Sequence, residues 1–435
     1  MQRHLPLSGV LFLGWAVAAH AEGLVDVYRL AEQNDASLRA AAQARLATRE
    51  AYPQARAQLL PNVALNAGLT RDWLEYPNMP ARDGSFTGKN YTLNLSQPLF
   101  DRARLVARDQ AEGVVRQADV DYANSQQELM LRAAEGYFTV LRAQAELRLA
   151  EADLAANESR LAQTEKRFEV GLIAITDLAD ARAARDQALA RRISAEASLA
   201  DAHEALRVLT AQGVERLDDV RVDLTPIRPD PVDPAAWVSF AEQQNLALQS
   251  ARLGLDIARQ EIEKQRSGHY PTVSLNASYG YQDTQLAGTP LENYDTRVGV
   301  QLNVPVYAGG GVESRSREAT YRFQQAQDGY EATRRDAVRA TRDAFRSVTS
   351  KISEIEAFEQ GVKSAETQLA ANEAGYEVGT RTIVDVITAQ SQLTQARRNL
   401  FNARYDYLLA TLRLKRAAGT LQLADLEALQ QQALR

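Results

Sequence analysis

Four short segments of this 435-residue chain alternate between apolar and polar residues. They run from Asn62 to Thr70, from Tyr91 to Ser96, from Thr272 to Tyr281 and from Arg297 to Val304. A period of two predicts strands with one apolar face and one small, polar face. Strands of about ten residues with this alternation are typical of outer-membrane barrels, and an ordinary soluble sheet is the alternative that the pattern leaves open.

Two very long helical patterns follow the strand pairs, from about Asp101 to Glu165 and from about Gly310 to Gly375. Apolar residues recur in them every seven positions, at Leu147, Leu154, Leu161 and Phe168 and again at Val348, Ile355, Val362 and Leu369. A sustained heptad repeat predicts coiled-coil packing. Each helix should be on the order of 100 Å long, end at a turn that contains glycine, and be followed by a returning helix.

The chain is duplicated. Leu60-Pro61-Asn62 and its continuation reappear as Tyr270-Pro271-Thr272, and Phe168-Glu169-Val170-Gly171 reappears as Tyr376-Glu377-Val378-Gly379. We therefore predict two repeats, each of helix, strand hairpin, long helix and returning helix. The expected divisions are a signal peptide at 1–21, a first repeat at 22–224 with its hairpin at 61–100, a Pro-rich linker at 225–234, a second repeat at 235–420 with its hairpin at 270–307, and a tail at 421–435.

The first residues predict export. Arg3 is followed by an apolar run from Leu5 to Ala19 and by Ala19-His20-Ala21, which is the pattern of a secretory signal peptide cleaved after Ala21. A membrane-spanning helix is the alternative, but the run is shorter than the ~20 apolar residues that a span needs. No later segment reaches that length, so residence in a membrane would require a barrel.

The composition excludes most classes of catalytic site. The chain has no cysteine, which excludes thiolate metal sites, disulfides, Cys nucleophiles and a Cys-linked lipid anchor. Of four histidines, only His203 and His269 follow the signal peptide, and they lie far apart in the sequence. The net charge of −6 gives no electrostatic reason to expect a nucleic-acid partner. We expect no enzyme, no metal and no cofactor.

Four strands cannot close a barrel, because small barrels begin near eight strands. Strands in lipid also cannot leave an open edge, so the chain must oligomerise. Two copies would give a filled barrel and three copies would give a lumen. The residues themselves do not choose between three copies and four.

The turn between the second long helix and its returning helix closely resembles the TolC family of outer-membrane efflux channels. Its sequence is Tyr376-Glu377-Val378-Gly379-Thr380-Arg381-Thr382-Ile383-Val384-Asp385-Val386. The first turn, from Arg167 to Asp177, and the run Asn402-Ala403-Arg404-Tyr405-Asp406-Tyr407 resemble this family too. The resemblance implies a homotrimer in outer-membrane lipid, with a 12-stranded β-barrel continued by an α-helical periplasmic tunnel. It implies a passive exit duct for efflux or type I secretion, which works with a periplasmic adaptor and an inner-membrane ABC or proton-driven transporter.

The same resemblance assigns roles at the periplasmic end of the tunnel, which opens like an iris in that family. Asp385 matches the first aspartate of an acidic ring at the aperture, and Thr388 stands where some members have a second. A latch is implied at Thr176, Asp177, Tyr376 and Arg381. The alternative is that Asp177 and Asp385 are only helix N-terminal charges favoured by the dipole.

The tips of the two turns should dock the adaptor, and the residues concerned are Val170, Gly171, Leu172, Val378, Gly379 and Thr380. A plain helix C-cap there is compatible with docking. As a whole-protein alternative, a periplasmic coiled-coil adaptor or scaffold without a pore would also have long helical hairpins, but it would lack the four amphipathic strands.

Overall fold

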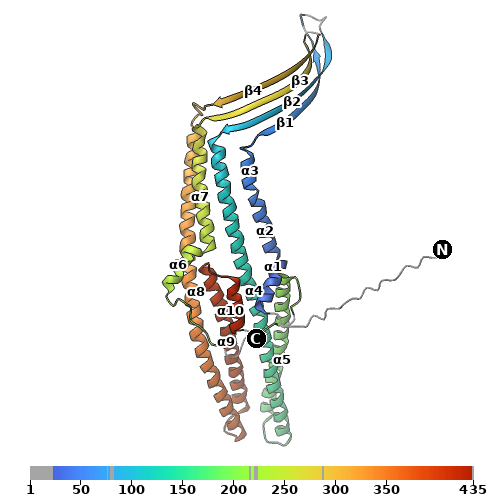
Figure 1. Ribbon diagram of the computed structural model, residues 1–435. Coiled ribbons are helices and arrows are strands. Elements are labelled where there is room, and N and C mark those ends of the chain that lie inside the picture. The colour runs from blue at the N-terminus through green and yellow to red at the C-terminus, as the bar shows by residue number, and fades with distance from the viewer. Residues whose placement is uncertain are drawn as a thin grey trace, which may run out of the picture.

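The computed structural model describes residues 23–75, 77–78, 83–214, 217–219, 224–286 and 289–433. The molecule is elongated: its helices run along one axis, and a four-stranded sheet lies at one end of them (Figure 1). The predicted signal peptide, residues 1–21, lies outside the described residues.

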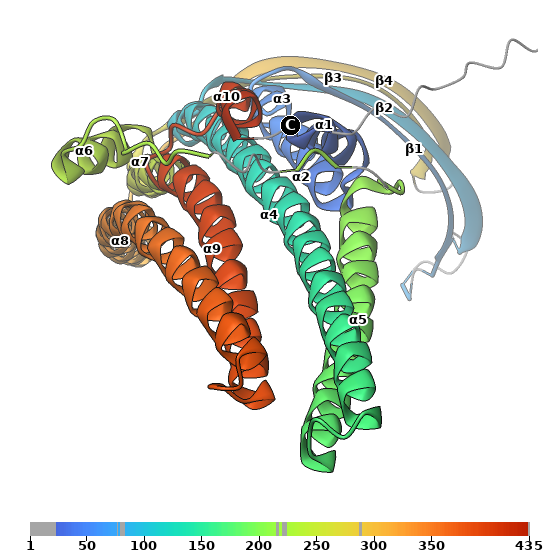
Figure 2. The ribbon, with the colours of Figure 1, turned by 90° about the horizontal axis from the view of Figure 1, so that it is seen from below.

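The sheet contains the two predicted hairpins side by side. Strands β1 (Asn62–Leu74), β2 (Gly84–Phe100), β3 (Thr272–Leu286) and β4 (Thr289–Asn303) are antiparallel neighbours in the order β1-β2-β3-β4. The strands have 13 to 17 residues, so they extend beyond the alternating segments. The sheet is curved and arches over the ends of the helices (Figures 1 and 2).

Two helices span most of the length of the molecule, as the heptads predict. Helix α4 (Arg102–Glu169) has 68 residues and α8 (Gly311–Glu377) has 67. At about 1.5 Å per residue each is roughly 100 Å long. The returning helices α5 (Ile175–Thr210) and α9 (Ile383–Ala417) pack along the lower halves of α4 and α8 (Figure 1).

The helix that precedes each hairpin is broken, whereas the sequence pattern predicted a continuous one. The first repeat has α1 (Leu24–Asn34), α2 (Ala36–Arg49) and α3 (Ala51–Ala57), and the second has α6 (Pro234–Gln244), α7 (Leu246–Arg266) and the short η2 (Ser267–His269). Asp35 caps α2 by accepting from the Leu38 N–H at 2.7 Å, and Asn245 caps α7 by accepting from the Leu248 N–H at 3.0 Å. The two breaks occupy corresponding places, where a side chain replaces the missing backbone partner.

The apolar core lies midway along the molecule, where α4 and α9 meet α1 and the C-terminal α10 (Leu423–Ala433). Tyr137 and Phe138 of α4 are fully buried there, with ring centroids 5.5 Å apart. The Tyr137 hydroxyl donates to the backbone carbonyl of Asp218 at 2.6 Å, so its polar atom has a partner. Burying each large side chain stabilises the fold by roughly 1.5–3 kcal/mol, which holds the two repeats together at this level.

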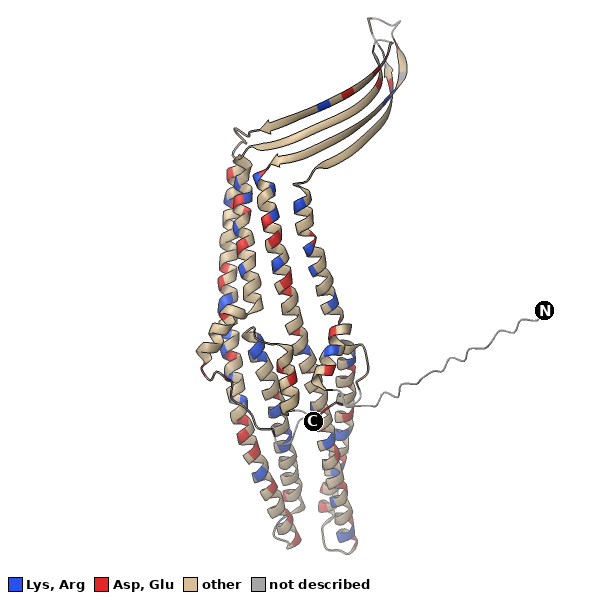
Figure 3. Ribbon diagram, viewed as in Figure 1, with Lys and Arg blue, Asp and Glu red and all other residues tan. Residues whose placement is uncertain are grey.

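Charged side chains follow the helices along their length and are sparse on the sheet (Figure 3). Among the described residues, no helix has the length and apolar character that a membrane crossing requires.

Candidate functional site

The first turn, between α4 and α5, is shaped by one glycine. Gly171 has φ of +75°, a backbone conformation that other residues adopt only with strain. The Leu172 N–H donates to the carbonyl of Arg167 at 2.9 Å, which closes the C-terminus of α4. This closure turns side chains outward: Val170 is 69 % exposed and Leu172 is 74 % exposed.

The second turn, between α8 and α9, repeats this geometry. Gly379 has φ of +77°, and the Thr380 N–H donates to the carbonyl of Gly375 at 2.8 Å. Val378 is 74 % exposed. Both turns lie at the end of the molecule opposite the sheet (Figure 1). The chain therefore presents two similar tips with small, apolar surfaces.

Asp385 lies in the first turn of α9 and forms a capping box with Thr382. Its Oδ2 accepts from the Thr382 N–H and from the Thr382 hydroxyl, both at 2.9 Å, and its own N–H donates to the Thr382 Oγ1 at 3.2 Å. These hydrogen bonds, together with the nearby positive charge of Arg381, lower the pKa of Asp385 below its ordinary value. The side chain is therefore a fixed carboxylate at neutral pH. Its capping box is also what the alternative interpretation requires, in which Asp385 is only a charge at the N-terminus of a helix.

The latch residues lie at the same end of the molecule, on α5, on α8 and in the turn before α9. Thr176 and Asp177 lie in the first turn of α5, and Tyr376 lies near the end of α8. The guanidinium carbon of Arg167 is 4.9 Å from the Tyr376 ring centroid, so a cation–π contact joins α4 to α8. Among the described residues, the Tyr376 hydroxyl is buried without a hydrogen-bond partner, and no bond links it to Asp177 or links Arg381 to Thr176.

Polar residues that the sequence analysis did not single out connect the two helical hairpins above the tips. Asp153 of α4 is 4 % exposed; it accepts from Arg191 of α5 at 2.8 Å and from the Thr394 hydroxyl of α9 at 3.4 Å. Arg160 of α4 lies 3.5 Å from Glu373 of α8, and burial lowers the pKa of its guanidinium. Asp153, Arg160 and Arg167 follow one another at seven-residue intervals, a signal that the sequence contained.

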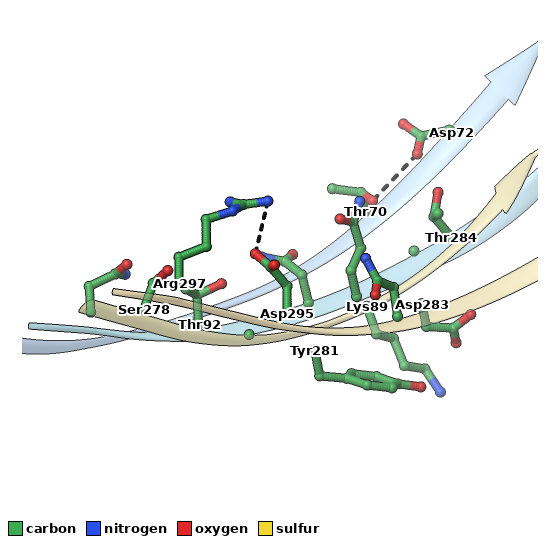
Figure 4. A pocket seen from close by; sticks show the side chains of 16 residues that line it. Thr70, Asp72, Lys89, Thr92, Ser278, Tyr281, Asp283, Thr284, Asp295 and Arg297 are labelled. Atoms are coloured by element: carbon green, nitrogen blue, oxygen red, sulfur yellow. Dashed lines mark hydrogen bonds and ion pairs between the residues drawn. The ribbon is translucent and has the colours of Figure 1, made fainter. Parts of the chain in front are cut away.

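The polar face of the sheet is concave. A hollow of about 460 Å³ opens on it, lined mostly by side chains of one strand face, among them Thr70, Asp72, Asp295 and Arg297 (Figure 4). Arg297 forms an ion pair with Asp295 at 2.9 Å, and the Thr70 hydroxyl donates to Asp72 at 3.4 Å. The interior of the curved sheet is thus hydrophilic.

The opposite, convex face is apolar and exposed. Leu65, Leu69, Val298 and Val300 keep between 66 and 73 % of their surface open. From Tyr294 to Val304 the chain advances ten residues, which at about 3.3 Å per residue and a tilt of about 40° gives a height of about 25 Å. That is the height of the apolar band of an outer-membrane strand, and so large an exposed apolar surface marks an interaction site.

The sequence matches the family described as Outer membrane efflux protein over residues 27–212 and 237–420, and the chain belongs to this family. It is similar to the outer membrane protein TolC of Vibrio cholerae, with 40 % identity over 98 % of this chain and 97 % of the relative. It is also similar to the alkaline protease secretion protein AprF of Pseudomonas aeruginosa, with 31 % identity over 97 % of this chain and 89 % of that one.

A solved structure agrees on the fold. The outer membrane protein VceC of Vibrio cholerae superposes with a TM-score of 0.79 at 24 % identity, over 91 % of this chain and 96 % of that chain. The resemblance read from the tip motifs is therefore confirmed, and with it the TolC-like fold and the outer-membrane channel class. The alternative of an adaptor without a pore is wrong.

Proposed function

We propose that three copies of this chain form a passive exit duct across the outer membrane and the periplasm. The observation that carries the proposal is the curved four-stranded sheet, with an exposed apolar convex face and a polar concave face. Strands β1 and β4 are its two edges. Since lipid tolerates no open sheet edge, the β4 edge of one copy pairs with the β1 edge of the next, and three sheets close a ring of twelve strands.

The helices continue that ring into the periplasm. Two helices of roughly 100 Å per copy, with their returning partners, give the tunnel wall. The polar concave face of the sheet provides a watery lumen at its outer end. Cargo passes without energy input from the duct itself, and an inner-membrane ABC or proton-driven transporter supplies the drive. The likeness to both TolC and an alkaline protease secretion protein supports efflux and type I secretion as the two settings.

At the far end the six tip residues dock a periplasmic adaptor. The support is their exposure and their backbone geometry: Val170, Leu172 and Val378 project from turns whose glycines let another helix approach closely. The latch of Thr176, Asp177, Tyr376 and Arg381, whose bonds are not formed within the described residues of a single chain, closes in the assembled trimer and holds the tunnel shut until docking. Three Asp385 carboxylates form the aperture ring. With Thr388 at the second position, the ring carries three carboxylates and not six.

The proposal is tested by expressing the full chain with its signal sequence and separating the membranes. We expect a trimer in the outer-membrane fraction that migrates as a trimer in unheated detergent gels and as a monomer after heating. Purified trimers should then conduct ions in planar bilayers. A monomer recovered from the periplasmic fraction, or trimers that do not conduct, would refute the duct.

A further inference from the structure

On β2, β3 and β4 the convex face of the sheet changes from tyrosine to charged side chains near the outer end of the sheet. Tyr91, Tyr281 and Tyr294 lie opposite one another on β2, β3 and β4, with both neighbouring pairs of ring centroids 5.1 Å apart. Tyrosine rings of this kind mark the level of lipid headgroups. Two residues further out on each strand, the same face carries charge.

The charged residues two positions outward from the tyrosines form an outer row, and its positive and negative charges are unevenly divided among the strands. Lys89 of β2 is opposite Asp283 of β3, which is opposite Glu292 of β4. Figure 4 shows Lys89 and Asp283 on the side of the strands away from Arg297. Like charges directly opposite one another repel, so the β3–β4 side repels an anion. The β1–β2 side adds a second cation, Arg71, whose Cα lies opposite that of Thr87.

Among the described residues, neither Arg71 nor Lys89 forms an ion pair, although Asp283 lies opposite Lys89 across β2 and β3. The Arg71 guanidinium donates to two neutral hydroxyls, Thr87 Oγ1 at 3.1 Å and Ser85 Oγ at 2.9 Å, which orient it without neutralising it. The register makes Arg71 and Lys89 diagonal neighbours across β1 and β2, with Cα atoms roughly 7–8 Å apart.

The surroundings of Arg71 set its level in the bilayer. On the same face of β1 it lies between Leu69, 72 % exposed, and Trp73, 75 % exposed. A cation on the lipid-facing surface is costly at the bilayer midplane and costs close to nothing at the interface. Arg71 therefore lies at the headgroup level, next to apolar surface that extends inward along Leu69 and Leu93.

From this arrangement we propose a lipid-binding site: Arg71 and Lys89 bind the phosphate-bearing headgroup of an outer-leaflet lipid, whose acyl chains lie along Leu69 and Leu93. The inference rests on the proposed outer-membrane duct. Two adjacent cations fit a phosphate, because charge-assisted hydrogen bonds to its oxygens are short and strong. The hydroxyls of Thr87 and Ser85 hold the guanidinium fork in place, which lowers the entropy lost on binding.

The test uses delipidated trimers of the full mature chain in detergent, titrated with lipid A that carries two phosphates and followed by native mass spectrometry. The double variant Arg71→Gln with Lys89→Gln should bind this lipid at least tenfold more weakly than the wild type. Lipid A stripped of its phosphates should bind both proteins equally weakly. The matched control is Arg297→Gln, which removes a cation from the concave face and should leave affinity unchanged.

Each other outcome overturns the site. If the double variant keeps wild-type affinity, the two cations bind no headgroup. If millimolar inorganic phosphate competes fully, the site binds the free anion and not a lipid. If the double variant falls apart in lipid-free detergent, Arg71 and Lys89 stabilise the contact between copies instead. Because wild-type trimer and conductance are measured first, failure of the duct itself would already be evident before any lipid is added.

Discussion

Asp35 anchors the N-terminal helices to α4, and the loss of local stability when it is replaced can be predicted quantitatively. Its side chain is 8 % exposed and makes a two-pronged ion pair with Arg132, at 3.1 Å from each oxygen, while it also caps α2. Burial by itself raises the pKa of Asp35, but the hydrogen bonds from Arg132 and from the Leu38 N–H outweigh it and the pKa is lowered. The carboxylate therefore stabilises the fold at neutral pH.

The magnitude divides into two parts. The cap contributes about 1 kcal/mol. An ion pair to a buried carboxylate contributes more than a surface pair, but the Arg132 side chain is 36 % exposed and water screens it, so we take about 2 kcal/mol. Asp35→Asn keeps an oxygen for the cap and loses the charge, about 2 kcal/mol. Asp35→Ala loses both, about 3 kcal/mol.

Hydrogen exchange of the α1 and α2 amides in purified trimers measures these losses, because 1.4 kcal/mol is a factor of ten in local opening. Exchange should accelerate roughly 30-fold in Asp35→Asn and more than 100-fold in Asp35→Ala. The matched control is Asp119→Asn, which breaks the half-exposed pair of Asp119 with Arg45 between the same two helices, α2 and α4, and should change exchange less than about fivefold.

The pH dependence has a definite sign. Because the folded-state pKa of Asp35 is lowered, its contribution is fully present above the unfolded value near 3.9 and is lost as pH falls through the folded value. The difference in protection between wild type and Asp35→Asn should therefore be constant at neutral pH and shrink below about pH 4. Equal exchange in wild type and Asp35→Ala at pH 7 would refute the anchor.

Three further predictions concern the tips. Asp385→Ala should reduce cation selectivity and block by divalent cations in planar bilayers, since three carboxylates on the axis attract cations, and unchanged selectivity would rule out the acidic ring. Tyr376→Phe with Arg381→Ser should raise single-channel conductance, and unchanged conductance would contradict the latch. Gly379→Ala places a side chain at φ of +77°, which should destabilise the turn by about 1 kcal/mol and weaken cross-linking to the adaptor; wild-type cross-linking would show that the tip makes no close contact.

The long helices and the four strands could be predicted from the sequence, because burying one face of such an element requires apolar residues at a fixed spacing. Apolar residues seven apart specified α4 and α8, and alternation specified the four strands. The breaks at Asp35 and Asn245 were missed because the apolar pattern continues across them. Both residues are good N-caps, so the capping signal was available, but the period alone cannot show where a helix restarts.

The tips were predictable only in part, for a similar reason. Gly171 and Gly379 fix turns through local backbone geometry, which a sequence motif records. The partner of Tyr376 depends instead on how two helical hairpins pack, and packing places Arg167 over its ring. Local sequence does not predict contacts between segments some 200 residues apart. The seven-residue spacing of Asp153, Arg160 and Arg167 does show which face of α4 makes these contacts.

The three polar residues Asp153, Arg160 and Arg167 on one face of α4 also bear on how the tunnel opens. Below the apolar core, α4 contacts α8 and α9 through the polar side chains of Asp153, Arg160 and Arg167. Polar pairs in a helix interface fix its register, yet they contribute little net energy because each pays for its desolvation. A junction of this kind holds the two hairpins in one alignment without fastening them strongly. We infer that the lower halves of the helices are built to separate while the core above them stays closed.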